Sequence, residues 1–371
     1  MTKETTAIEG PTDSIQGSTL TQALKLLNKV ADPKSSYPML SNVRMESKGD
    51  NLVLRASDLY THLEVKLPYT EKKFLTCVNA KALGKMIATK GKKQGERVKF
   101  ELIGEKLEIE THGLQVKLGT HPTEDFPTFP KSNWKPIAEW SSKAFADALE
   151  YVLPAASEDE TRLAINSLLL QDGKIIATDG HRMHWAPTPT ETKEGVVMSR
   201  DAAKVLYLLV GLTDKVAIFK GENRLLFQTG NWCMACRTPD TQFPPYNQVI
   251  PKHQTGKLRI ESGLFVNAVK KLKLLASVRT EGIRLTYNQK LEIFVNNPEL
   301  GDASVELNVS DWNQENPGHL DSPEIQIGFC ATYLLEAVAK SKEFILKFDS
   351  ELDPIIISDG ERGAVVMPMR I

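Results

Sequence analysis

Residues 173–181 read GKIIATDGH, a strand-like alternation that ends in a loop aspartate. Related segments follow the same plan, with NLVLRASDL at 51–59 and KLEIFVNNPE at 290–299. The loop acid or amide recurs at nearly constant intervals, first after 121 residues and then after 118. A recurrence of this kind predicts three tandem copies of one structural repeat.

A phenylalanine–proline pair marks the chain exits from these repeats. Phe126-Pro127 in EDFPTFP returns 117 residues later as Phe243-Pro244 in TQFPPYNQVIP. Proline ends strand pairing and starts a turn, so both sites suit a connection between modules. The boundaries are therefore expected near residues 136 and 255. The three predicted domains are residues 1–136, with 1–17 in part a flexible leader, then 137–255 and 256–371.

Each predicted domain also contains two helix candidates, because apolar residues recur at helical spacing between the strand-like segments. Ser18 or Thr19 is expected to cap the first helix, and Asn79 to start the second, with Met86 turned inward. Two helices and several short strands, three times over, predict an α+β protein. The six candidates cover residues 18–30, 79–93, 141–157, 199–212, 261–279 and 331–342.

The composition is that of an ordinary globular protein. The 371 residues are 41% hydrophobic and 25% charged, and no apolar run approaches the roughly 20 residues that a membrane span needs. The first residues lack the apolar stretch of a signal peptide. Four cysteines give no disulfide framework, so a reduced, cytoplasmic protein without membrane contact is expected.

Positive charge is concentrated in the helix candidates. The whole chain carries −1, whereas the six candidates together carry +11, which leaves −12 for the remainder. A lysine-rich helix surface would attract duplex DNA while the acidic remainder discourages unspecific contact. The alternative is that these lysines only solvate exposed helix faces, and the candidate at 141–157, with a net −1, departs from a uniformly basic set of helices.

Three long strings resemble one family, the bacterial DNA polymerase III beta subunit or sliding clamp. They are PMLSNVRMESKGDNLVLRASDL, DETRLAINSLLLQDGKIIATDGHRM and the C-terminal VVMPMRI. The resemblance implies three topologically similar domains per chain and two chains closed head to tail into a ring, with the helices lining the hole. It also implies a non-catalytic processivity factor for DNA replication that encircles duplex DNA without reading its sequence.

The same resemblance implies a hydrophobic pocket that binds short peptides with glutamine and leucine or phenylalanine anchors. The implied partners are the polymerase III alpha subunit, the clamp loader, and other polymerases and repair proteins. Gln248 and Met183 stand where arginine and leucine are commoner in the family. The implied pocket residues are Ile165, Thr178, Gly180, His181, Arg182, Met183, Pro244, Gln248, Val249, Val365, Met367, Pro368 and Met369.

DNA contacts and a dimer interface are expected on other parts of the chain. Lys34 matches a basic position that meets the DNA backbone in the family, and the remaining DNA candidates lie on predicted helices. For the homodimer, the resemblance places Leu274 and Leu275 at an interface position and Leu118 on the facing edge. The DNA candidates on the helices are Lys25, Lys29, Lys81, Lys85 and Arg200.

Two other motifs could indicate chemistry. Cys233 and Cys236 have the spacing of a zinc half-site, but on a strand they face opposite sides and no further ligand pair completes the site. His181 beside Asp179 could serve acid–base catalysis, yet no nucleophile, phosphate loop or carboxylate pair accompanies them. No cofactor and no enzyme activity are therefore expected. A monomeric peptide-binding adaptor without DNA is the alternative to the ring.

Overall fold

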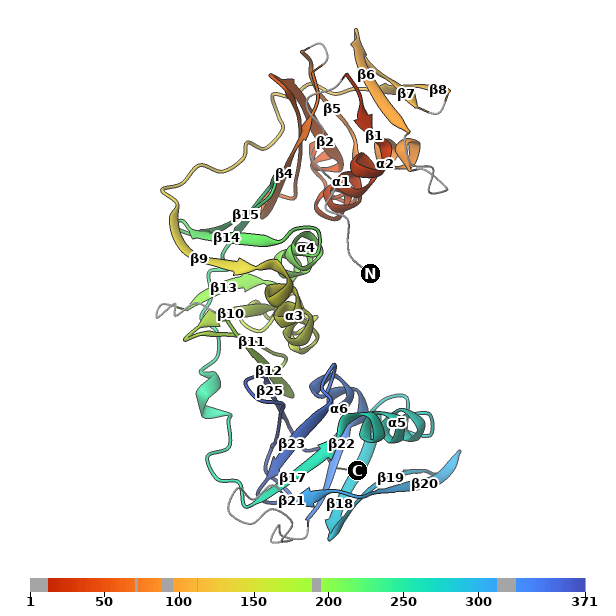
Figure 1. The fold of residues 1–371 in the computed structure, drawn as a ribbon, viewed down its shortest axis with the longest axis vertical. Coiled ribbons are helices and arrows are strands. Elements are labelled where there is room, and N and C mark those ends of the chain that lie inside the picture. Colours follow the sequence, from red (N-terminus) through yellow and green to blue (C-terminus); the bar gives the residue numbers. More distant parts are fainter. Residues whose placement is uncertain are drawn as a thin grey trace. The chain divides into compact units, whose positions relative to one another are not determined.

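The computed structural model describes residues 13–70, 73–88, 96–111, 113–188, 195–311 and 325–370, which form two compact units (Figure 1). The first unit combines the chain up to Ala144 with Lys204–Thr238, and the second combines Phe145–Ala203 with the chain from Pro239 onward. Each unit therefore joins segments that are distant in sequence. The division into three domains at residues 136 and 255 stays a prediction. No helix of the described residues is long and apolar enough to cross a membrane.

Two antiparallel sheets make up the strands of the first unit. The larger, in spatial order, contains β5 (Leu75–Asn79), β2 (Asn42–Lys48), β3 (Asn51–Ser57), β4 (Thr61–Pro68), β16 (Trp232–Arg237), β15 (Arg224–Thr229), β14 (Lys215–Lys220) and β9 (Lys135–Ser141). The smaller contains β1 (Ile15–Gln16), β6 (Arg97–Ile103), β7 (Lys106–Thr111) and β8 (Leu114–Gly119). Strand β8 is an edge strand of the smaller sheet among the described residues.

Helices α1 (Gly17–Val30) and α2 (Ala80–Ile87) pack together in the first unit, where the Thr21 hydroxyl donates to the Ile87 carbonyl at 3.4 Å. Helix α2 begins directly after Asn79, close to the predicted start, and the Asn79 side chain caps it by accepting the Ala82 N–H at 2.9 Å. The predicted cap of α1 by Ser18 or Thr19 is wrong. Its chain enters the helix directly from β1, and the Gly17 N–H donates to the Glu96 carbonyl at 2.8 Å.

The second unit also contains two antiparallel sheets. The larger, in spatial order, contains β13 (Val196–Ser199), β10 (Ser167–Gln171), β11 (Lys174–Thr178), β12 (Arg182–Pro187), β25 (Gly363–Val366), β24 (Ile355–Ser358), β23 (Glu343–Phe348), β17 (Gly256–Glu261) and β21 (Ser310–Asp311). The smaller contains β20 (Gly301–Leu307), β19 (Lys290–Asn297), β18 (Gly282–Asn288) and β22 (Ile325–Cys330), with β20 at an edge of the described sheet.

Four further helices and three short 3₁₀ turns complete the described elements. Helices α3 (Ser142–Val152) and α4 (Arg200–Val210) cross the boundary between the units, and α5 (Ser262–Lys273) and α6 (Ala331–Ala337) belong to the second. The 3₁₀ turns are η1 (Pro38–Ser41), η2 (Leu153–Ala155) and η3 (Tyr246–Gln248). The apolar core of the second unit packs α5 and α6 against the strands, with Phe265, Leu334 and Val366 fully buried or nearly so.

Several predicted helix details need correction. Helix α6 ends at Ala337, not at Lys342, because the chain turns and Lys340 adopts a left-handed backbone with φ of 63°. Helix α5 ends at Lys273, and a series of turns replaces its predicted last turns. Met86 is 40% exposed and does not point inward. With these bounds the six helices carry a formal +6, a smaller excess than the +11 of the candidate segments.

Candidate functional site

The turn between β11 and β12 is held by one threonine and one aspartate. The Thr178 hydroxyl donates to the Arg182 carbonyl at 2.6 Å and accepts the Gly180 N–H at 3.1 Å. Asp179 Oδ1 accepts the N–H groups of His181 and Arg182 at 2.8 and 3.0 Å. Gly180 has φ of +94°, a backbone conformation that L side chains rarely adopt, so glycine suits this position. Asx-type bonding of this kind fixes the turn without help from a ligand.

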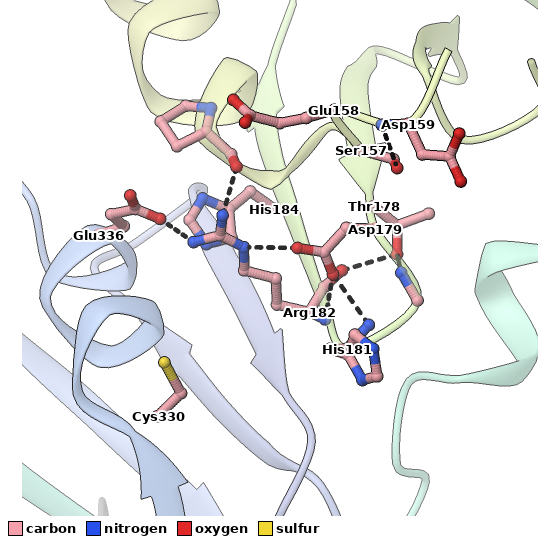
Figure 2. A network of polar contacts seen from close by, with 12 residues as sticks. Ser157, Glu158, Asp159, Thr178, Asp179, His181, Arg182, His184, Cys330 and Glu336 are labelled. Carbon is pink, nitrogen blue, oxygen red and sulfur yellow. Dashed lines mark hydrogen bonds and ion pairs between the residues drawn. The ribbon is translucent and has the colours of Figure 1, made fainter. Parts of the chain in front are cut away.

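Arg182 connects this turn to two other segments of the second unit (Figure 2). Its Nε donates to Asp179 Oδ2 at 3.0 Å, and its Nη atoms reach the Pro154 carbonyl and the Glu336 carboxylate. The guanidinium also lies 4.2 Å from the centre of the Tyr333 ring. The side chain is only 9% exposed, so the arginine is a buried, multiply bonded cross-link.

A pocket of ≈ 430 Å³ opens beside this arginine. Its charges are largely paired, since Arg200 contacts Glu158 while Arg182 contacts Asp179 and Glu336. Arg200, which the sequence placed among the DNA contacts, therefore faces a carboxylate with its side chain 15% exposed. The lining residues are Pro154, Ala156, Ser157, Glu158, Arg162, Asp179, His181, Arg182, Arg200, Tyr333 and Glu336.

The larger sheet of the second unit carries an apolar cluster on the face opposite to the Arg182 side chain. Strand alternation turns Arg182 and His184 toward the helices and Met183 to the other side, where Met183 pairs in register with Val365. Val365 in turn pairs with Ile356 on β24. We call this group the outer apolar cluster. It consists of Leu169, Ile176, Met183, Tyr246, Ile356 and Val365, with the half-buried Trp185, Val197, Phe243 and Ile250 packed against it.

The C-terminal tail continues from this cluster. The Met367 N–H donates to the His181 carbonyl at 3.0 Å, and the Met369 N–H donates to the Gly328 carbonyl at 2.9 Å. Met367 is 40% exposed, whereas Pro368 and Met369 are half-buried. The two sequence strings that suggested the pocket, ATDGHRM and VVMPMRI, are thus hydrogen-bonded neighbours across β12 and β25.

The other predicted pocket residues lie at different depths. Pro244, Gln248 and Val249 flank Tyr246 in the loop that contains η3, with Gln248 and Val249 exposed. Ile165 is buried and lies outside the outer apolar cluster. Sequence reasoning missed Tyr246, Trp185 and Ile356, because each reaches the cluster through long-range pairing or loop packing.

A second turn with the same motif was also missed. Residues 359–362 read DGER between β24 and β25, as residues 179–182 read DGHR between β11 and β12. The Arg362 Nε donates to Asp359 Oδ1 at 3.2 Å, and its guanidinium lies 4.8 Å from the centre of the Tyr151 ring. A search for the D-G-x-R pattern would have found it.

Strand β12 also carries a fully buried histidine, His184. His184 stacks on Tyr151 with ring centres 5.0 Å apart, and its Nδ1 lies 2.8 Å from the Tyr151 carbonyl oxygen. Burial lowers the pKa of His184 to about 4, so the ring is neutral at physiological pH. The Tyr151 hydroxyl donates to the Ala337 carbonyl at 2.9 Å, which ties α3 to the end of α6.

The proposed DNA and dimer residues lie elsewhere on the chain. Leu274 is 79% exposed at the end of α5, whereas Leu275 packs against the core of the second unit. Leu118 is half-buried on the edge strand β8. Five lysines are exposed on α1, on α2 or in the turn after α1, namely Lys25, Lys29, Lys34, Lys81 and Lys85.

The cysteine pair lies on a strand as predicted. Burial raises the pKa of Cys233 to about 11 and that of Cys236 to about 12, so both thiols are protonated at neutral pH. Within the described ranges, no three histidine, cysteine or acidic residues are grouped to hold a metal ion.

Comparison with known proteins identifies the family. The N-terminal domain of the DNA polymerase III beta subunit matches residues 14–130, and its C-terminal domain matches residues 247–370. The chain is 25% identical to the beta sliding clamp of Pseudomonas putida, covering 96% of this chain and 99% of the relative. It is 22% identical to that of Escherichia coli, covering 94% and 97%.

Solved structures show the same fold. A sliding clamp of Pseudomonas aeruginosa bound to griselimycin matches with a TM-score of 0.86 at 23% identity, over 96% of this chain and 99% of that one. The beta subunit of Thermotoga maritima matches with a TM-score of 0.86 at 19% identity and the same coverage. With both terminal domains matched and the likeness extending over nearly its whole length, the chain belongs to the DNA polymerase III beta subunit family, the beta sliding clamps.

Proposed function

We propose that this chain works as a sliding clamp in which two copies encircle duplex DNA and hold replication and repair proteins on it. The family is a non-catalytic processivity factor, so its action is tethering. The single observation that carries the proposal is the pairing of Met183 with Val365, which unites the β11–β12 turn and the C-terminal tail beside the outer apolar cluster.

Peptide docking follows from the chemistry of that cluster. Met367 is 40% exposed at its margin, Val249 is 50% exposed in the neighbouring loop, and methionine adapts to varied apolar partners. An extended peptide with leucine or phenylalanine anchors would cover these side chains, while polar groups of the η3 loop contact its flanks. We assign the polymerase III alpha subunit, the clamp loader, other polymerases and repair proteins to this one surface, where they would compete.

Ring closure is supported by two edge strands. Strand β8 in the first unit and β20 in the second each end a four-stranded described sheet, and each offers unpaired backbone groups to another chain. Leu274 is exposed in the segment that connects α5 to β18. Strand β18 belongs to the same four-stranded sheet as β20. Head-to-tail pairing of β8 with β20 of a second copy would use both edges and close the ring after two such contacts.

The DNA contacts are proposed for the exposed lysines. Lys25 and Lys29 on α1, and Lys81 and Lys85 on α2, are exposed and one helical turn apart within each pair. Flexible, solvated lysines bind phosphates weakly and without regard to sequence, which allows sliding. Retention would then come from the closed ring. Arg200 is not part of this proposal, since it is paired with Glu158.

The oligomeric state tests the ring. Size-exclusion chromatography with light scattering should give about twice the 41.3 kDa mass of the chain at micromolar concentration. A stable monomer would overturn the ring and leave the adaptor, in which the same peptide surface works without DNA.

A further inference from the structure

We propose that the first unit carries a second peptide-docking surface, at the turn between β3 and β4, which takes a segment with an apolar anchor beside acidic side chains. We call it the arginine-flanked surface. The inference goes beyond the docking proposed for the outer apolar cluster, because it adds a separate site with a different ligand preference. The surface consists of Leu59, Tyr60, His62, Phe129, Arg224 and Arg237.

The turn between β3 and β4 is built like the turn between β11 and β12. The Leu59 N–H donates to the Ser57 hydroxyl oxygen at 3.0 Å. The Tyr60 N–H donates to Asp58 Oδ1 at 2.9 Å. The same two kinds of bond fix the turn at Asp179 in the second unit. Side-chain bonding therefore holds both turns in one shape without a ligand.

The neighbouring strand is also equivalent in the two units. Strand β4 pairs with β16 as β12 pairs with β25, in an antiparallel ladder. The Arg237 N–H donates to the Tyr60 carbonyl at 2.8 Å, just as the Met367 N–H donates to the His181 carbonyl at 3.0 Å. Arg237 in the first unit thus has the place of Met367 in the second, with a cation instead of an apolar side chain.

An aromatic residue from a connecting loop packs at both places. Phe129 follows the first phenylalanine–proline pair at the same spacing at which Tyr246 follows the second. The Phe129 ring meets the His62 ring edge-on, with ring centres 6.1 Å apart. His62 has the register position of Met183, which packs with Tyr246 in the outer apolar cluster. The first unit therefore repeats the turn, the strand end and the aromatic cover of the docking surface in the second.

Leu59 is strained and exposed. Its φ is 76°, a left-handed backbone conformation for which the turn in the second unit uses Gly180. Leu59 is 51% exposed and Tyr60 is 63% exposed, so the folded chain gains little by burying them. A costly backbone conformation that presents two apolar side chains to solvent points to a contact with another molecule.

Two arginines give this surface a preference for acidic ligands. Arg224 on β15 lies directly opposite Arg237 on β16, and strand alternation puts both on the face that carries His62. Like charges directly opposite each other destabilise a sheet. The described residues provide no ion-pair partner for either guanidinium, and Arg224 Nη1 is buried without a hydrogen bond to them. A carboxylate beside the pair would relieve the repulsion and accept charge-assisted hydrogen bonds.

The acidic residues of β4 and its turn are already bonded. Asp58 Oδ1 accepts N–H groups of the turn, and Glu64 is paired with Arg55 at 2.6 Å. Burial and the positive charge of Arg224 lower the pKa of His62 to about 4, so this ring is neutral at physiological pH. The positive charge of the arginine-flanked surface therefore comes from its two arginines.

The experiment uses the full-length chain and two synthetic peptides with leucine and phenylalanine anchors, one flanked by aspartates and the other by asparagines. A benzophenone beside the anchor forms photo-cross-links, which mass spectrometry assigns to residues 57–62 or to the outer apolar cluster. The cross-link yield at residues 57–62 against peptide concentration gives the Kd of this surface alone. The aspartate peptide should bind there about three- to tenfold more tightly than the asparagine peptide, the effect of one or two exposed ion pairs.

Two variants separate the charge from the anchor. Arg224→Gln combined with Arg237→Gln should remove the preference for aspartate. Lys48→Gln combined with Lys215→Gln, which removes two exposed charges elsewhere in the first unit, should keep it. Leu59→Gly should weaken both peptides about five- to tenfold at residues 57–62 without destabilising the chain to denaturant, because glycine adopts a positive φ without strain.

Four results would overturn the inference. They are cross-links confined to the outer apolar cluster, equal Kd values for the two peptides at residues 57–62, the same loss in the lysine and arginine variants, and a Leu59→Gly chain that unfolds more easily. The last would give Leu59 a structural role. An arginine variant that keeps the aspartate preference but loads poorly onto circular DNA would also overturn it, by assigning the arginines to DNA.

Discussion

Replacing Leu274 with lysine should break the proposed ring without unfolding the chain. The side chain is 79% exposed, so nearly all of it is available for burial by a second copy. Full burial of a leucine side chain contributes about 1.5–3 kcal/mol, which scales to about 1.2–2.4 kcal/mol for the exposed part. A two-chain head-to-tail ring contains this contact twice, so the dimer should lose about 2.4–4.8 kcal/mol, a rise in Kd on the order of 10²–10³-fold.

The assay is light scattering over a dilution series, with circular dichroism to check the fold. Leu275 is unsuitable as a target, because it packs against the core of the second unit and its loss would also destabilise the chain. Leu352→Lys is the matched control, since Leu352 is 82% exposed in the turn between β23 and β24. A Leu274→Lys variant that dissociates no more readily than Leu352→Lys would show that the interface lies elsewhere.

Three further predictions concern DNA, peptide preference and pH. Reversal of four exposed lysines to glutamate should reduce loading onto nicked circular DNA at low salt and the dependence of that loading on salt, with the fold checked by circular dichroism. Unchanged loading would contradict the proposed DNA contacts of Lys25, Lys29, Lys81 and Lys85. Gln248→Arg should improve binding of peptides with an aspartate near the anchor, and an equal gain for neutral peptides in calorimetry would show that packing sets the preference. Burial lowers the pKa of His184 to about 4, so as pH falls below about 6.5 the unfolded chain takes up a proton at this residue while the folded chain does not. The free energy of unfolding, measured with denaturant, should therefore be full above that pH and drop by about 2 kcal/mol between pH 7 and pH 4.5. His184→Gln should flatten this loss.

The sequence was informative where structure is local. Alternating apolar residues predicted strands such as β11 and β16, and the start of a helix at Asn79 was correctly predicted, because both signals depend on neighbouring residues. The helix ends were less predictable. After α6 ends at Ala337, Lys340 adopts a left-handed backbone conformation that a lysine in the sequence does not predict. The start of α1 at Gly17 likewise depends on the pairing of β1 with β6, a long-range contact that the sequence does not predict.

Long-range packing explains what the sequence left out of the site. Met183 and Val365 were expected near each other from family resemblance, but Ile356 and Tyr246 join them through strand register and loop packing. Arg200 was placed among the DNA contacts because the family resemblance implies a basic residue at the start of this helix, and the structure pairs it with Glu158 from a distant loop. Ion pairs of this kind depend on tertiary structure, so charge counts alone could not separate Arg200 from the exposed lysines.

The most direct test of the sliding clamp is retention on DNA of defined topology. The chain, loaded onto a nicked circular duplex, should co-elute with the DNA through gel filtration at a salt concentration that screens individual phosphate contacts. Cutting the same circle once should release the protein, because a closed ring slides off a free end. Equal retention on circular and linear DNA, or no retention on either, would contradict encirclement.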